Sequence, residues 1–125
     1  MTKIKEPKQK KITKKELARI AKLEKKKMWE EVRQSIIMRD NGCAICHSYS
    51  GMNVHHLLPR EIEELFFNKL NLLCLCYHHH KFGSPINDIS AHKNALPFVI
   101  WLARNRPEQF EFLSKFSEER WLKNL

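Results

Sequence analysis

Two pairs of cysteine and histidine residues constrain this chain more than any other feature. Cys43 and Cys46 are separated by two residues, and a second cluster of cysteine and histidine follows in residues 74–80. Zinc takes four ligands at the corners of a tetrahedron, and two close pairs that are joined by a loop can supply them. The spacing predicts a structural zinc ion held by Cys43, Cys46, Cys76 and His79.

The second pair has alternative ligands. Cys74 could replace Cys76, but one intervening residue makes these two cysteines a poor chelating pair, which favours a buried, apolar role for Cys74. The run His78-His79-His80 also allows the ligand register to shift by one. Disulfides are the other use of cysteine, yet the N-terminal segment has no apolar run typical of a secretory signal. We therefore expect a reducing, cytoplasmic compartment and metal binding.

The size of the chain is a second reason to expect a metal. Its 125 residues, of which 42% are hydrophobic, suit one domain with a modest core, to which a bound ion adds folding energy. We predict a flexible basic arm at 1–12 and a single domain at 13–125, with its core at 39–83 and a C-terminal helical extension at 84–125. No apolar run reaches the roughly 18 residues of a membrane-spanning helix, so no membrane contact is expected.

Positive charge is concentrated at the N-terminus. The net charge is +9, and residues 1–27 account for all of it because acidic and basic residues balance in the remainder. A neutral body with a basic arm is typical of proteins that bind nucleic acid, since each lysine that neutralises a phosphate releases a counterion. A solvated surface that aids solubility is the alternative. The lysines predicted to contact nucleic acid are Lys3, Lys5, Lys8, Lys10, Lys11, Lys14, Lys15, Lys22, Lys25, Lys26 and Lys27.

The apolar pattern predicts a long helix after the arm. Thr13 and Glu16 have the spacing of a capping box, and apolar residues then recur at helical intervals down to Asp40. Asn41-Gly42 supplies a stop signal. This helix should carry a basic face and lead directly to Cys43.

Shorter elements are expected beyond the first cysteine pair. Residues 53–58 have strand character and should form one strand of a hairpin, residues 71–75 should be extended, and a helix should open within 77–82. Pro97 and Pro107 each stand where a first helical turn could begin, which predicts two C-terminal packing helices.

The residues between the two ligand pairs carry a more specific pattern. Val54-His55-His56-Leu-Leu-Pro59 lies between them, and Asn71 precedes Cys76. The order CxxC, HHxxP and N-x4-C-x2-HH resembles the signature of the HNH endonucleases over residues 39–83. The lead-in Arg-Asp-Asn-Gly before the first cysteine is also similar to that family. The resemblance implies an α+β class: a small zinc-stapled ββα-metal core with a long basic N-terminal helix and two C-terminal helices.

The resemblance also implies a role for each matching residue. His56 falls on the general base, Asn71 on the residue that orients the site, and His80 and His55 on ligands of a catalytic divalent metal, either Mg²⁺, Mn²⁺ or another transition metal. Histidine is the natural base near neutral pH, and neighbours in a strand point to opposite faces, so one can bind the ion while the other faces water. The implied activity is metal-dependent hydrolysis of phosphodiester bonds in DNA, in which the ion stabilises the departing 3′-oxygen.

Two positions depart from the family pattern. The fourth zinc ligand is commonly cysteine in the family and is His79 here. Some relatives, including nuclease colicins, have another metal-binding histidine four residues after His80, where this chain has Ser84. His92 is a candidate to substitute for that ligand, and a helix-start or surface position is the alternative.

Other functions fit parts of the sequence. Cys43-Ala-Ile-Cys46-His47 also matches the c-type haem attachment motif, but that use needs an export signal and leaves the second cluster without a purpose. A zinc-stapled DNA-binding module without catalysis is the serious alternative, although it would not need a base beside a metal ligand. Residues 91–110 resemble the tail of small phage or prophage HNH proteins, which implies phage or host DNA-processing partners. Cleavage of both strands of a duplex would favour a homodimer.

Overall fold

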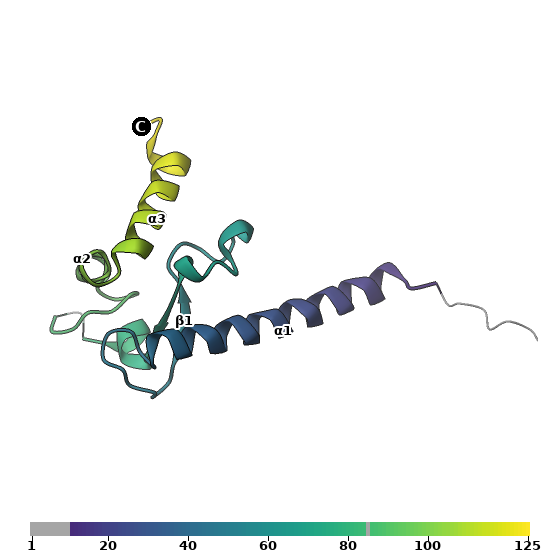
Figure 1. Ribbon diagram of the computed structural model, residues 1–125, viewed down its shortest axis with the longest axis horizontal. Coiled ribbons are helices and arrows are strands. Elements are labelled where there is room, and N and C mark those ends of the chain that lie inside the picture. The colour runs from purple at the N-terminus through teal and green to yellow at the C-terminus, as the bar shows by residue number, and fades with distance from the viewer. Residues whose placement is uncertain (1–10, 85) are drawn as a thin grey trace, which may run out of the picture.

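The computed structural model describes residues 11–84 and 86–125, and in these residues the chain is a small α+β fold. Its sheet has two antiparallel strands, and several helices surround it. This arrangement confirms the expected class and the two C-terminal helices (Figure 1). In chain order the elements are α1 (Lys14–Asp40), β1 (Asn53–His56), η1 (Glu63–Leu65), η2 (Lys69–Asn71), β2 (Leu72–Leu75), η3 (His78–Phe82), α2 (Ala95–Asn105), α3 (Pro107–Ser117) and η4 (Glu118–Leu122).

Helix α1 begins and ends where the sequence predicts. The Thr13 side chain accepts from the backbone of Glu16, and the Glu16 carboxylate accepts in return from the Thr13 backbone, which completes the capping box. At the other end Asn41 adopts a left-handed conformation with φ 54°, and its N–H donates to the carbonyl groups of the last turn. Only the C-terminal part of α1 packs on the sheet, while its first half extends away from the body (Figure 1).

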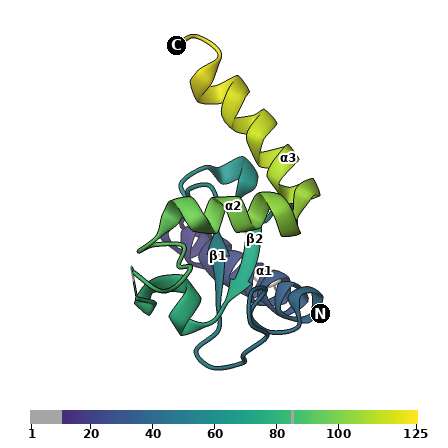
Figure 2. The same ribbon diagram turned by 90° about the vertical axis from the view of Figure 1, so that its left-hand side faces the viewer.

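The sheet separates two small hydrophobic clusters. Val54, Leu72 and Cys74 face the end of α1, where Ile36 and Ile37 are buried. Leu73 and Leu75 lie on the opposite face, in one buried cluster with Phe98 and Leu102 of α2 and Leu113 of α3. Figure 2 shows the two strands between α1 and α2. The register pairs His55 with Leu73 and His56 with Leu72. Because successive side chains of a strand alternate between its faces, the two histidines point to opposite faces of the sheet.

Strand β1 is shorter than the predicted strand, which ran to Leu58. Leu57 still donates its N–H to the Asn71 carbonyl at 2.8 Å. At Leu58, however, the Asn71 side-chain amide replaces the backbone partner, accepting from the Leu58 N–H at 2.7 Å and donating to the Leu58 carbonyl at 3.1 Å. A side chain therefore ends the ladder two residues early, and the chain leaves the sheet.

Asp40 fixes the C-terminal helices to the end of α1. Its buried carboxylate accepts from Arg39 and from Arg106 at 2.8 Å each, and from the backbone N–H of Cys74 at 2.9 Å. Burial opposes ionisation, but the two guanidinium groups and the backbone donor outweigh it and lower the pKa of Asp40. The side-chain amide of Gln109 in α3 also donates hydrogen bonds to the backbone carbonyls of Leu70 and Leu72.

One of the two C-terminal helices begins earlier than expected. Pro107 is the first residue of α3, as predicted, whereas α2 begins at Ala95, two residues before Pro97. A helical turn forms at His78–Phe82 and ends at Gly83. In the described part of the chain, no helix has the length and apolar character that a membrane crossing requires.

Candidate metal centres and candidate active site

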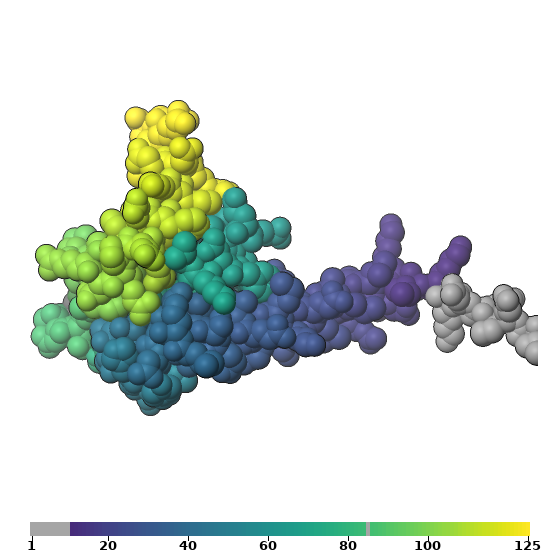
Figure 3. Space-filling view, in the orientation of Figure 1, coloured from purple at the N-terminus to yellow at the C-terminus, as the bar shows by residue number. Residues whose placement is uncertain are grey.

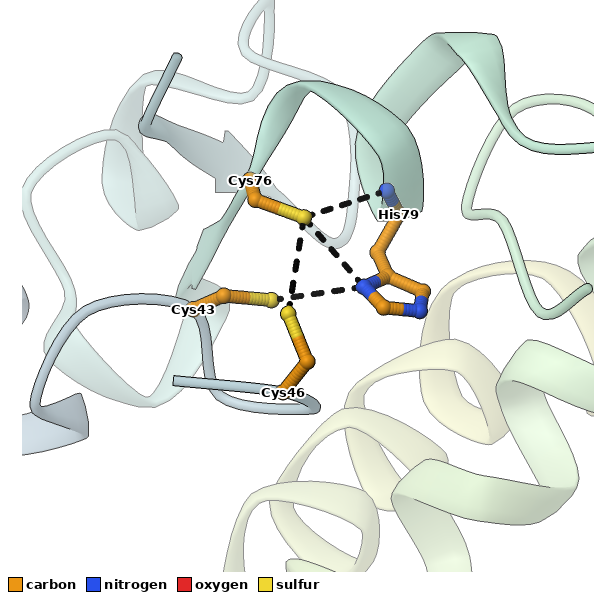
Figure 4. A group of neighbouring side chains, drawn as sticks. All are labelled: Cys43, Cys46, Cys76 and His79. Atoms are coloured by element: carbon orange, nitrogen blue, oxygen red, sulfur yellow. Dashed lines mark hydrogen bonds between the residues drawn. The ribbon is translucent and has the colours of Figure 1, made fainter. Parts of the chain in front are cut away.

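Four predicted ligands converge at one end of the sheet (Figure 4). Cys43 and Cys46 belong to the tight turn after α1, Cys76 follows β2, and His79 lies on η3. The turn is attached to β2 because Ala44 donates its N–H to the Cys74 carbonyl at 2.8 Å. The cysteine pair on the turn is thereby held next to the pair that follows the strand.

Gly42 allows the turn to close. Its φ is +78°, and a Cβ added there would meet the carbonyl oxygens of His47 and Ser48 at 3.0 Å. A residue with a side chain would therefore be strained in φ and crowded against backbone. The stop signal that was predicted for the helix also shapes the metal-binding turn.

The distances within this cluster fit a tetrahedral zinc ion. The sulfurs of Cys46 and Cys76 are 3.7 Å apart, and His79 Nδ1 lies 3.6 Å from Cys43 Sγ and 3.3 Å from Cys76 Sγ. Zn–S bonds of about 2.3 Å and Zn–N bonds of about 2.0 Å would place two sulfurs about 3.8 Å apart and sulfur and nitrogen about 3.5 Å apart. Cys43, Cys46, Cys76 and His79 could therefore hold a structural metal such as zinc.

The alternative ligands lie elsewhere. Cys74 is buried on the α1 side of the sheet, and burial raises the pKa of its thiol to about 11. The His78 ring points to Asp88, with Nε2 2.9 Å from the carboxylate. The structure therefore places Cys76 and His79 in the cluster and leaves Cys74 and His78 outside it.

A second cluster consists of three histidines from three segments. His55 Nδ1 of β1 lies 3.1 Å from His80 Nε2 of η3, and His92 Nε2 lies 3.1 Å from the same nitrogen. Two nitrogens bound to one ion at about 2.1 Å are separated by about 3.0 Å at a right angle and about 3.4 Å at a tetrahedral angle. The three rings could therefore hold one metal ion.

Burial keeps His55 and His80 uncharged. It lowers the pKa of His55 to about 3, with further lowering from the neighbouring His80 and His92 rings. Burial, then the nearby His92 and Lys81, lowers the pKa of His80 to about 4. Near neutral pH both rings are neutral, so each has a nitrogen lone pair for a cation.

Backbone hydrogen bonds bring His92 into the cluster. The N–H of Ala91 donates to the His79 carbonyl at 2.9 Å, and that of His92 donates to the His80 carbonyl at 3.1 Å. The buried Ser90 hydroxyl donates to the same His80 carbonyl. Residues 90–92 thus run beside η3, and this brings the His92 ring next to His80. His92 is therefore close enough to serve as the third ligand, which Ser84 cannot supply.

His56 lies beside the three-histidine cluster but takes no part in it. Its ring stacks on Trp29 of α1, with centroids 5.0 Å apart, and contacts Phe66. Nε2 lies 3.1 Å from the Phe66 carbonyl oxygen. A carbonyl can only accept, so the neutral ring carries its hydrogen on Nε2 and keeps a lone pair on Nδ1. Burial lowers the pKa of His56, and the Phe66 carbonyl partly opposes that shift.

His56, the candidate base, and the three-histidine cluster line the same open pocket. It has a volume of about 470 Å³ and is lined by His55, His56, His80 and His92, together with Arg60, Lys81 and the acidic Glu61. The imidazole rings, and two cationic side chains against one carboxylate, suit a phosphate group.

Asn71 lies beneath this pocket and does not line it. Besides its two bonds to Leu58, its amide donates to the Leu65 carbonyl at 3.4 Å, and the side chain is fully buried. Asn71 therefore ties the segment between β1 and β2, which carries Phe66, to the sheet. Through Phe66, whose carbonyl contacts His56, Asn71 can orient the candidate base.

The lysine-rich half of α1 is exposed to solvent. All six lysines of the helix are exposed, as is Lys11 before it. Lys25 places its Nζ 4.3 Å from the centre of the Phe66 ring. Of the other predicted nucleic-acid contacts, Lys3, Lys5, Lys8 and Lys10 lie outside the described residues, with most of the arm expected at 1–12.

No protein-family model, curated protein or solved structure matches the chain. Its function must therefore be inferred from its own residues and their geometry.

Proposed function

We propose that the chain is a metal-dependent endonuclease of the HNH type, with a ββα-metal core, that hydrolyses phosphodiester bonds in DNA. One observation carries the proposal: His56, with a free Nδ1, lies in the same pocket as a cluster of three imidazoles. Hydrolysis of a phosphodiester needs a base near neutral pH and neutralisation of growing negative charge. A protein that only binds DNA needs neither arrangement.

His56 acts as the general base in this proposal. Its Nδ1 takes a proton from a water molecule that attacks the phosphorus, and the imidazolium that forms keeps its Nε2–H donated to the Phe66 carbonyl. Stacking on Trp29 holds the plane of the ring. The proton therefore arrives on a ring whose orientation is already fixed.

In this proposal His55, His80 and His92 would hold the catalytic ion. A bound divalent cation would supply Lewis-acid stabilisation of the phosphate and of the departing 3′-oxygen. Three nitrogen donors favour a transition-metal ion over Mg²⁺, because imidazole suits transition metals whereas Mg²⁺ prefers oxygen ligands. Arg60 and Lys81 line the same pocket and can pair with phosphate oxygens.

Zinc in the four-residue cluster has a structural role in this scheme. Its ligands belong to the turn after α1, to the end of β2 and to η3, and His80 follows His79 directly. An ion there fixes the segment that presents His80. DNA is the proposed partner. A homodimer would allow both strands of a duplex to be cut, and phage or host DNA-processing proteins are the other proposed partners.

The test is nicking of supercoiled plasmid by the full-length, zinc-loaded protein. Relaxed circles should form with added Mn²⁺, more slowly with Mg²⁺, and not at all without a divalent ion. His92→Ala should need more Mn²⁺ to reach half its maximal rate. His78→Ala, which removes a histidine beside the ligands but outside both clusters, is the matched control. DNA that is bound and stays whole under every metal condition would refute the nuclease and favour the binding module.

A further inference from the structure

The charged residues of α1 are sorted by face. With about 100° between successive residues of an α-helix, five of its six lysines lie within about 60° of Trp29 around the axis. Lys27 lies on the far side, about 160° away by the same measure. The five lysines that share the face of Trp29 are Lys14, Lys15, Lys22, Lys25 and Lys26.

Acidic and apolar residues occupy the rest of the exposed helix. Glu16, Glu24, Glu30 and Glu31 all lie about 100° or more from Trp29, on the assumption of a regular helix. The apolar Leu17, Ile20 and Leu23 are exposed and also lie away from it. A helix that served only for solubility would have no reason to gather its lysines on one side.

This lysine face leads directly to the proposed active site. Trp29 stacks on the His56 ring, and the Lys25 ammonium lies over Phe66, whose carbonyl holds His56. Figure 3 shows the first half of α1 projecting beyond the body of the molecule. The face therefore extends the pocket outward along a helix that is otherwise unpartnered in the described part of the chain.

We infer that this lysine face of α1 binds the phosphates of duplex DNA on one side of the bond to be cut. The inference rests on the proposed function and adds a substrate class and a direction to it. At about 1.5 Å per residue, the stretch from Lys14 to Trp29 spans about 22 Å, which equals about six base pairs at about 3.4 Å each. Charge complementarity and continuity with the pocket both favour a duplex that flanks the site.

Adjacent lysines on opposite faces give a matched test. Lys26→Gln and Lys27→Gln remove the same charge at neighbouring positions, and each lysine has a glutamate four residues later. Because Lys22 precedes Lys26 by four residues whereas Glu24 precedes Lys27 by three, circular dichroism of both variants is the control for helix content. Binding of the full-length variants to a fluorescein-labelled duplex is measured by anisotropy over a series of salt concentrations, without added divalent metal. The observable is the slope of log K against log salt.

Lys26→Gln should make the slope shallower by about 0.9, because one phosphate contact is lost, and Lys22→Gln/Lys26→Gln by about 1.8. Lys27→Gln should leave the slope unchanged. Equal effects of Lys26→Gln and Lys27→Gln, or effects seen only with a single strand of the same length, would overturn the inference. Binding is measured apart from cleavage, so a wild-type protein that shows this face dependence but never nicks plasmid would refute only the proposed function.

Discussion

Replacing His56 with glutamine should remove the nicking activity while preserving the fold and both metal clusters. The glutamine amide can donate to the Phe66 carbonyl as the Nε2–H of His56 does. Neither its Oε1 nor its Nε2 can take a proton from water near neutral pH, however. His56→Ala loses the donor as well. The pair of variants therefore separates the base from its structural contacts.

The contacts of His56 set the expected cost in stability. The ring makes one hydrogen bond, worth about 1 kcal/mol net, and packs on Trp29 and Phe66 at 5.0 and 4.8 Å. Each of the two aromatic pairs contributes about 0.5–1.5 kcal/mol, so alanine should lower the free energy of unfolding by about 2–4 kcal/mol. Glutamine should recover about 1 kcal/mol of this loss through the hydrogen bond.

Loss of the base has a different magnitude and a different readout. General-base catalysis contributes about 10²–10⁴-fold, which corresponds to about 2.7–5.4 kcal/mol in the activation barrier. Single-turnover nicking at saturating Mn²⁺ should therefore fall at least about a hundredfold in both variants. Urea denaturation and zinc content provide the controls. A zinc-loaded His56→Gln protein that nicks within about tenfold of wild type would refute the role of His56 as base, since base loss costs more than that.

Three further results are expected. One tightly bound zinc per chain should be released by a chelator with loss of the fold around residues 40–85, and Cys46→Ser should release it at lower chelator concentration; folded, metal-free protein with paired cysteines would contradict this. His92→Ala should weaken binding of the catalytic ion and recover most of its rate at high Mn²⁺, because mass action offsets a lost ligand; a defect that no metal concentration repairs would argue against a ligand role. Asp40→Asn should lower the free energy of unfolding by about 2–3 kcal/mol at neutral pH, less than a fully buried pair because the arginines are partly exposed. Folding lowers the pKa of Asp40 below its ordinary value of 3.8, so this contribution is complete above that value and disappears as pH falls through the folded pKa; urea denaturation at neutral and acid pH checks both statements.

Most of the fold and of the four-residue cluster was predictable because the signals are local. The capping box at Thr13 and the stop at Asn41 set the limits of α1 through bonds between residues close in sequence. The gaps between Cys43 and Cys46 and between Cys76 and His79 are short enough for each pair to approach one ion. Alternation along β1 likewise fixes that His55 and His56 face opposite ways.

The remaining features depend on residues that are distant in sequence. His92 joins His55 and His80 only because residues 90–92 bond to the backbone of η3, and no fixed spacing encodes that closure. β1 ends early because the Asn71 side chain takes the partners of Leu58.

The sequence alone therefore determined the four candidate zinc ligands and where the long basic helix lies, since chelation by close pairs and helix capping act over a few residues. Only the tertiary structure decided that Trp29 packs against His56. That contact orients the lysine face of α1 toward the pocket, because the rotation of a helix about its axis is set by the side chains that it buries.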